Sequence, residues 1–186
     1  MTEAKPTPKA IRTSLALWHQ IEVWVAVLAF SSIAVLLIYD VFIREAAIPA
    51  LGLAGIDGRF LLLYGSQKIA VFLLIIGAFT GIGIATWTGA QLVPKVGHKL
   101  VPDRWNTEAN RFADLVTFLF LMAVTAVAAN FVYDTFLSGQ RGSTGVRIEV
   151  WKIQIAIPLG FASAALRYLA FALWPDLRPE DGDSLE

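Results

Sequence analysis

The sequence predicts an all-α membrane protein with four transmembrane helices, both termini cytoplasmic, and amphipathic interfacial segments beside the spans. Composition is the first reason: of 186 residues, 56% are hydrophobic and 16% are charged, against about 25% charged in soluble domains. The second reason is the stretch from Ile69 to Val93, which contains no charged residue. A helix needs ~20 apolar residues to cross ~30 Å of hydrocarbon, so this stretch is long enough.

Three further apolar stretches approach that length. The spans are predicted at roughly 22–43, 68–93, 112–137 and 149–174. A short interfacial lead-in precedes the second span, and Gly65 interrupts it. The fourth span is the least apolar. Its Pro158 removes a backbone donor and crowds the carbonyl of Gln154, so we expect a kink there.

Basic residues predict the orientation, because cytoplasmic loops carry an excess of Lys and Arg. With both termini inside, nine of the fifteen Lys and Arg lie on the cytoplasmic side and six on the other. Residues 1–21 are then a cytoplasmic N-terminal amphipathic segment. Residues 22–175 form the four-helix transmembrane domain, and 176–186 a disordered cytoplasmic tail. The connection 93–111 also has amphipathic character.

Charged residues within the spans fall at two levels, near the two interfaces, when depth is counted at ~1.5 Å per residue. Charges at such positions are costly and usually paired. We expect interhelical pairs of Lys68 with Asp40 or Asp134, and of Arg167 with Asp114; the alternative is that these side chains extend to lipid headgroups. None lies at the bilayer centre, where proton relays and ion paths place theirs. The chain is therefore poorly equipped to translocate an ion alone.

Small residues recur at every fourth position in two spans, and such ridges let another helix approach closely. They are Gly77, Gly81, Ala85 and Gly89 in the second span, and Ala156, Gly160 and Ala164 in the fourth. Two uses stay open: packing among the four helices, or docking onto a second membrane protein. Packing against a large membrane subunit is the leading hypothesis only because of the family resemblance given below.

The residues that would carry chemistry are few. The chain has no cysteine, which excludes disulfides and thiolate metal sites. His19 and His98 lie in predicted interfacial segments, whereas a haem-binding anchor needs ligands within its spans. The formal net charge of zero gives no nucleic-acid footprint. We therefore expect no enzyme activity, no cofactor, no metal and no nucleic-acid partner.

Three distributed motifs resemble one family, the small membrane subunit (DctQ-like) of tripartite ATP-independent periplasmic, or TRAP, transporters. The first span ends in Asp-Val-Phe-Ile-Arg over 40–44, and the second leads to Thr-Gly-Ala-Gln-Leu-Val-Pro over 88–94. The fourth contains Ile-Pro-Leu-Gly over 157–160 and then Ala-Leu-Arg over 165–167. The stretch 64–68 departs from the family, which often has a tryptophan and paired acids there.

The resemblance implies a non-catalytic small permease subunit of a sodium-coupled transporter for an organic anion, in a bacterial inner membrane. Its partners would be a large multi-span TRAP membrane subunit, which it scaffolds, a periplasmic substrate-binding protein and membrane lipids. Charged residues of the outer loops are then candidates for docking the binding protein: Asp57, Arg59, Arg141 and Arg147. The alternatives are a membrane-anchor subunit of a redox enzyme and a self-associating four-helix membrane protein.

Overall fold

The computed structural model describes residues 7–90, 106–142 and 148–178, and its long elements are all helices. Four helical stretches are long and apolar enough to cross a membrane. They are Lys9–Leu53, Gly58–Trp87, Glu108–Leu137 and Trp151–Leu173. The four predicted spans are therefore confirmed as helices. The predicted amphipathic connection, the tail from residue 179 and His98 lie outside the described residues.

The first element is far longer than a bilayer requires. Helix α1 (Lys9–Phe42) continues through a π-helical turn, η1 (Ile43–Ala47), into α2 (Ile48–Leu53). Pro8 precedes the first turn and Pro49 lies in the first turn of α2, where the missing N–H of proline costs least. From Lys9 on, the predicted N-terminal amphipathic segment is helical and continuous with the first apolar helix.

Glycines at both ends of the second long helix, α3 (Ser66–Trp87), set its limits. The 3-10 turn η2 (Gly58–Leu61) precedes α3, and Gly65 interrupts the chain with φ 95°, as predicted. At the other end Gly89 has φ 68°, and the Ala90 N–H donates to the Ala85 carbonyl at 3.1 Å. This is the glycine-terminated helix end in which a left-handed residue closes the last turn.

The second half of the chain forms another helical hairpin. Helix α4 (Asn106–Leu137) leads to α5 (Trp151–Gln154), α6 (Ala156–Leu173) and the short turn η5 (Pro175–Leu177). The break between α5 and α6 falls at Ile155, three residues before Pro158. This confirms the predicted irregularity, because a proline crowds the carbonyl four residues before it.

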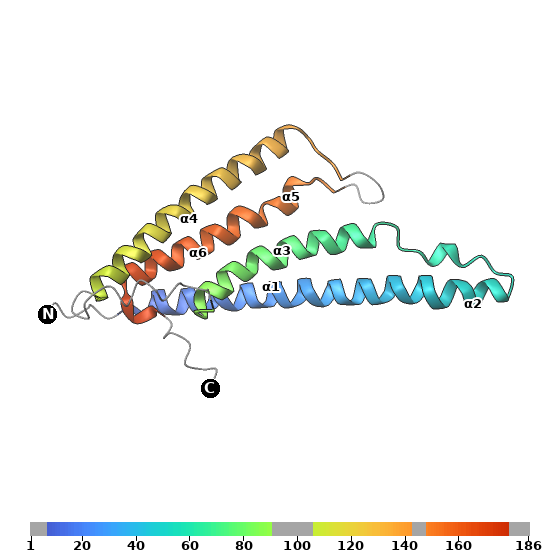
Figure 1. Cartoon of the computed structure of the whole chain (residues 1–186), viewed down its shortest axis with the longest axis horizontal. Helices are drawn as coiled ribbons and strands as arrows, with labels where there is room; N and C mark the ends of the chain where they lie inside the picture. The colour runs from blue at the N-terminus through green and yellow to red at the C-terminus, as the bar shows by residue number, and fades with distance from the viewer. Residues whose placement is uncertain (1–6, 91–105, 143–147, 179–186) are drawn as a thin grey trace.

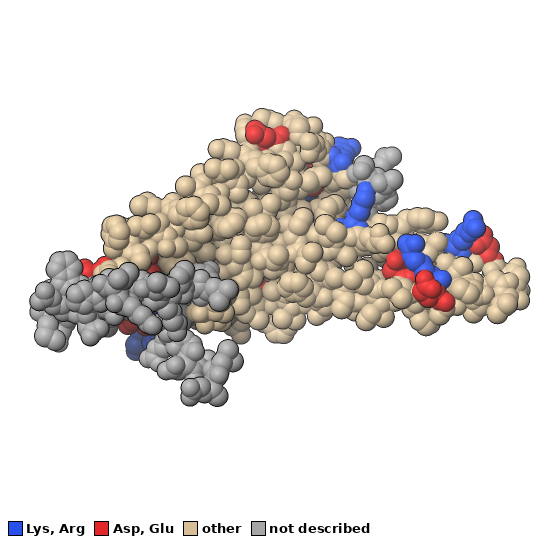
Figure 2. Space-filling view, viewed as in Figure 1, with Lys and Arg blue, Asp and Glu red and all other residues tan. Residues whose placement is uncertain are grey.

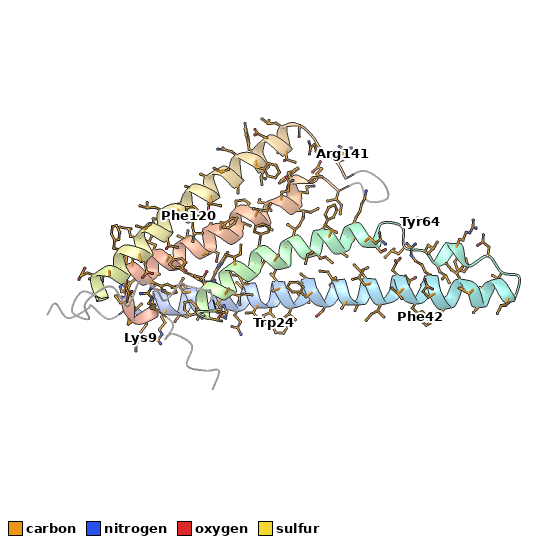
Figure 3. The ribbon with its side chains drawn as sticks, in the orientation of Figure 1. Lys9, Trp24, Phe42, Tyr64, Phe120 and Arg141 are labelled. Carbon is orange, nitrogen blue, oxygen red and sulfur yellow. The ribbon has the colours of Figure 1, made fainter. Side chains whose placement is uncertain are left out.

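The four long helices lie side by side in one layer, in the order α1, α3, α6, α4 (Figure 1). The two hairpins approach each other near Lys9 and spread apart toward Tyr64 and Arg141, which are labelled in Figure 3. We call these ends of the layer the Lys9 end and the Arg141 end. A single layer has little interior, so its buried apolar residues are mostly alanines, including Ala26, Ala29, Ala164 and Ala165.

Large apolar side chains cover the outside of the layer. Trp24 on α1 is 60% exposed and Phe120 on α4 is 65% exposed (Figure 3). On the face shown in Figure 2, charged side chains gather toward the Arg141 end, while the middle is almost uncharged. A soluble protein rarely exposes so much contiguous apolar surface, whereas lipid requires it.

Candidate subunit-interaction surfaces

Two charged residues expected to contact a binding protein belong to the connection between α2 and α3. The side chains of Asp57 and Arg59 are 77% and 79% exposed, with Oδ1 and Nε 3.9 Å apart. Asp57 also accepts a hydrogen bond from the Arg59 backbone N–H at 3.1 Å, which caps η2. Asp57 thus has a local structural role, while the Arg59 guanidinium is presented to solvent.

The other two candidates follow α4, on the opposite hairpin. Arg141 is exposed and pairs through its backbone with Glu149 in an isolated antiparallel bridge. Lys152 Nζ lies 2.8 Å from Glu149 Oε2, and this hydrogen bond lowers the pKa of Glu149. Arg147 lies outside the described residues. The connection between α2 and α3, which contains Asp57 and Arg59, therefore lies at the same end of the layer as Arg141, although the two belong to different hairpins (Figures 1 and 3).

A polar contact joins α1 to α3 near the Arg141 end. The carboxylate of Asp40 is buried, and its Oδ2 accepts a hydrogen bond from Arg44 Nε at 2.9 Å. Its Oδ1 accepts one from Ser66 Oγ, in the first turn of α3, at 3.1 Å. Asp40 thus bonds within its own helix and across to α3. The pairing of Lys68 with Asp40 or Asp134 stays a prediction.

The expected pair of Arg167 with Asp114 is wrong. Arg167 Nη2 lies 2.5 Å from Glu22 Oε2 of α1, and both side chains are buried. Asp114 instead pairs with Arg178, Nη2 to Oδ1 3.1 Å. Counting residues along each helix gave the correct level for these groups, but it does not tell which helix lies beside which.

Several members of the predicted small-residue ridges serve packing within the chain. A Cβ on Gly160 would collide with the backbone of Phe79 in α3, and one on Gly77 would lie 3.1 Å from the Phe30 ring of α1. Ala164 has no exposed surface. Gly89 ends α3 and does not extend its ridge. Assigning these four to a large subunit is corrected accordingly, because their space is filled or their conformation terminates the helix.

The remaining ridge residues of α3 face away from its neighbours. A Cβ on Gly81 would meet no atom within 4 Å, and Ala85 is half-buried one turn further on. At ~100° per residue, these two lie on the side of α3 opposite Ile76 and Thr80. We call the side with Gly81 and Ala85 the ridge face of the layer.

The other side of the layer, which we call the groove face, is hollowed. An open groove of about 290 Å³ lies over α3 between α1 and α6. Ile21 and Val25 of α1, Ile76 and Thr80 of α3, and the half-buried Ala156 of the second hairpin are among its lining residues. The two faces of the layer therefore differ in shape. The ridge face carries small residues, whereas the groove face contains the groove.

Within the described ranges, no group of three or more His, Cys, Asp or Glu side chains is placed to hold a metal ion. Polar side chains on the long helices mostly bond to their own helix. Thr80, Thr117 and Thr125, for example, each donate to the carbonyl four residues before them, at 2.7 to 2.8 Å. This is the arrangement of helices that lie against lipid or protein and expose no reactive groups.

Four apolar helices in one layer, with broad outward faces, define a multi-span membrane protein built for contact with lipid and with other proteins. The sequence model of one family matches residues 33–177, most of the chain: "Tripartite ATP-independent periplasmic transporters, DctQ component". The chain therefore belongs to the DctQ family, which confirms the resemblance in its motifs. It is a transporter subunit and not an enzyme. Neither a curated protein nor a solved structure matches it.

Proposed function

We propose that this chain is the non-catalytic small permease subunit of a sodium-coupled, binding-protein-dependent transporter for an organic anion. In this role it scaffolds the large transport subunit in a bacterial inner membrane and helps to dock the periplasmic binding protein. The DctQ family implies a TRAP complex with a large DctM and a periplasmic DctP subunit. Family membership favours this role over a redox-enzyme anchor or a solitary self-associating protein.

The single-layer arrangement is the observation that carries the proposal. A bundle of four helices would enclose its own core, but here only 6% of the most apolar stretch of α4 and 17% of that of α1 are buried. Such a layer presents two complete faces to its surroundings. A partner that covers one face gains a wide, rigid contact area, which is what a scaffold supplies.

We assign the large subunit to the ridge face. Small residues allow two helix backbones to approach closely, and packing of this kind drives helix association in lipid. Gly81 and Ala85 have this character and are not filled by the chain itself. Gly81→Leu with Ala85→Leu should abolish co-purification of the large subunit in mild detergent, while the variant chain still inserts in the membrane.

A matched control places the same bulk elsewhere. Ala123 and Ala126 lie on an exposed side of α4, so Ala123→Leu with Ala126→Leu should leave co-purification unchanged. If the Gly81→Leu, Ala85→Leu variant still co-purified with the large subunit, the ridge face would be rejected as the binding site. Equal loss in both variants would mean that the contact extends over the α4 edge as well.

The orientation with both termini in the cytoplasm is part of the proposal. The chain has no cysteine, so single introduced cysteines can be labelled without background. In intact spheroplasts, a membrane-impermeant maleimide should label Arg59→Cys and Gln140→Cys, and label Lys9→Cys only after the membrane is opened. The reverse pattern would invert the topology and remove the docking assignment.

Docking of the binding protein is assigned to Arg59, Arg141 and Arg147, with Asp57 beside them. Arginines there would meet acidic groups of the partner, and exposed charges of this kind affect the association rate more than the affinity. Arg141→Glu with Arg147→Glu should reduce solute uptake when binding protein is limiting and have less effect when it is in excess. Unchanged uptake at limiting binding protein would show that these arginines only face water.

A further inference from the structure

A cluster of polar side chains crosses the layer near its Lys9 end. Arg167 of α6 reaches Glu22 of α1 although α3 lies between these two helices. The side chain of Arg167 has no exposed surface and that of Glu22 is 7% exposed. The ion pair therefore links the two hairpins from one side of α3 to the other.

A glycine of α3 makes room for the pair. A Cβ on Gly83 would lie 2.7 Å from Arg167 Nη1 and 2.9 Å from the Glu22 carboxyl carbon, and closer still to Oε1. Any larger residue at this position would occupy the space through which the two side chains meet. Gly83 is thus required by a close approach of charged groups, and not by its backbone conformation.

The carboxylate of Glu22 is fully occupied. Its Oε2 accepts the Arg167 hydrogen bond, and its Oε1 accepts hydrogen bonds from Ser163 Oγ at 2.5 Å and from Trp18 Nε1 at 3.0 Å. Trp18 Nε1 also lies 2.9 Å from Ser163 Oγ. These bonds fix the position of the carboxylate between α1 and α6.

The guanidinium of Arg167 is less completely satisfied. Its Nε and Nη1 have no hydrogen-bond partner in the described part of the chain, and its Cζ lies 5.8 Å from the centre of the Trp87 ring. A buried ion pair with unmet hydrogen-bonding groups contributes little net stability, and its best-attested use is to specify geometry. The cluster is therefore better explained by the arrangement it enforces than by the free energy it supplies.

Two further sets of contacts join the hairpins. At the Lys9 end, Leu15 of α1 packs against the buried Ala170, Phe171 and Leu177. The contacts between α3 and α6 lie along one line. Gly160 of α6 packs on the backbone of Phe79 in α3, and the Phe79 and Phe161 rings meet edge to face at 5.7 Å. Two rods that touch along one line can rotate about it. A link from α6 to α1, one helix further away, opposes that rotation.

We propose that the Glu22–Arg167 pair, passing beside Gly83, is a strut that fixes the angle between the α1/α3 hairpin and the α4/α6 hairpin. Glu22, Arg167 and Gly83 are then positioning residues for the shape of the layer. The strut is independent of any large subunit, because it acts within this chain. Loss of the Glu22–Arg167 pair should therefore change the angle between the hairpins even in the isolated protein.

Distances between spin labels test the strut directly in the full chain in lipid nanodiscs. One label pair, on Ile38→Cys of α1 and Leu137→Cys of α4, spans the two hairpins far from the strut; both positions are exposed. A second pair, on Ile38→Cys and Val71→Cys, lies within the first hairpin and is the internal control. Over the ~24 Å of helix from Glu22 to Ile38, a rotation of about 10° moves a label by about 4 Å.

Glu22→Leu with Arg167→Met removes both charges together. We expect the distance distribution between the hairpins to broaden or shift by several Å, while the distribution within the hairpin stays narrow and unmoved. An unchanged distance between the hairpins would overturn the proposal, since the α3/α6 packing and the apolar contact of Leu15 would then set the angle.

A second pair of variants keeps the test decisive if the double variant does not fold. Gly83→Leu retains both charges but fills the gap, so it should broaden the distance between the hairpins as well. Gly81→Leu adds the same bulk two residues earlier, into open space on the ridge face, and should not. Equal distances in the Gly83→Leu and parent chains would likewise overturn the strut.

Discussion

Helices α4 and α6 belong to one hairpin but meet opposite surroundings. In the most apolar stretch of α6, 44% of the residues are buried, against 6% in α4. This stretch of α6 is nevertheless less apolar than that of α4. The polar side chains Ser163 and Arg167 of α6 bond across to α1. Polar groups at membrane depth need protein partners, whereas apolar side chains are satisfied by lipid.

Hydroxyl groups on the two helices show the same difference. Thr117 and Thr125 on α4 donate to carbonyls of their own helix at 2.8 Å. Ser163 on α6 donates instead to Glu22 of α1. A hydroxyl that is satisfied locally does not determine a neighbour, whereas one that crosses to another helix does.

The largest effect should come from breaking the ion pair on one side only. Arg167→Met leaves the buried carboxylate of Glu22 without its cation, and an uncompensated buried charge costs about 3–5 kcal/mol. We expect the free energy of unfolding, measured by denaturant titration in mixed micelles, to fall by that amount. If Arg167→Met destabilised the chain less than Gly160→Leu does, the central role assigned to α6 would be contradicted.

A smaller loss should follow from crowding the contact between α3 and α6. Gly160→Leu places a side chain against the Phe79 backbone, and overpacking of this kind costs about 1–3 kcal/mol. The midpoint of thermal unfolding in detergent should drop. Ala123→Leu on the exposed side of α4 is the control and should leave the midpoint unchanged. An equal drop for Ala123→Leu would contradict the difference in burial between α6 and α4.

Smaller effects than that of Arg167→Met are expected on α4, whose Asp114 pairs with Arg178 just after η5. The side chain of Asp114 is 3% exposed but that of Arg178 is 36% exposed, so this pair is more screened than the fully buried pair of Glu22 and Arg167. Arg178→Gln should therefore lower the unfolding free energy by less than Arg167→Met does. Thr117→Val, which removes only a bond within α4, should stay within about 0.5 kcal/mol of the parent.

Sequence reasoning found the elements because they follow from local chemistry. Uncharged length predicts the four helices, Gly65 the break before α3, and Pro158 the irregularity between α5 and α6. Each of these depends on a few neighbouring residues and on the thickness of a bilayer. No knowledge of the other helices is needed.

Sequence reasoning could not predict which helices lie beside one another in the layer. Arg167 and Asp114 fall at one level, but so does Glu22, and level alone does not choose between the two carboxylates. A signal was present: Ser163 and Arg167 are four residues apart, as are Trp18 and Glu22, so each pair lies on one helix face. Matching these two polar faces would have indicated that side chains of α1 and α6 meet.

The ridges show a second limit. A small residue every fourth position predicts close packing but not the identity of the neighbour. Gly160 and Ala164 are used inside the chain and Gly89 is a helix terminator, whereas Gly81 alone among these glycines is left open. Identical spacing thus covers three different physical roles, which separate only when the layer is assembled.

The unbroken run of α1, η1 and α2 also gives the chain mechanical leverage. From Glu22 to Leu53 this rod extends ~47 Å, and from Glu22 back to Lys9 only ~20 Å. Each degree of swing about Glu22 therefore carries the Leu53 tip ~0.8 Å sideways and the short arm ~0.3 Å. A partner protein that binds near Leu53 therefore restrains rotation of this helix about Glu22 with less force than one that binds near Lys9.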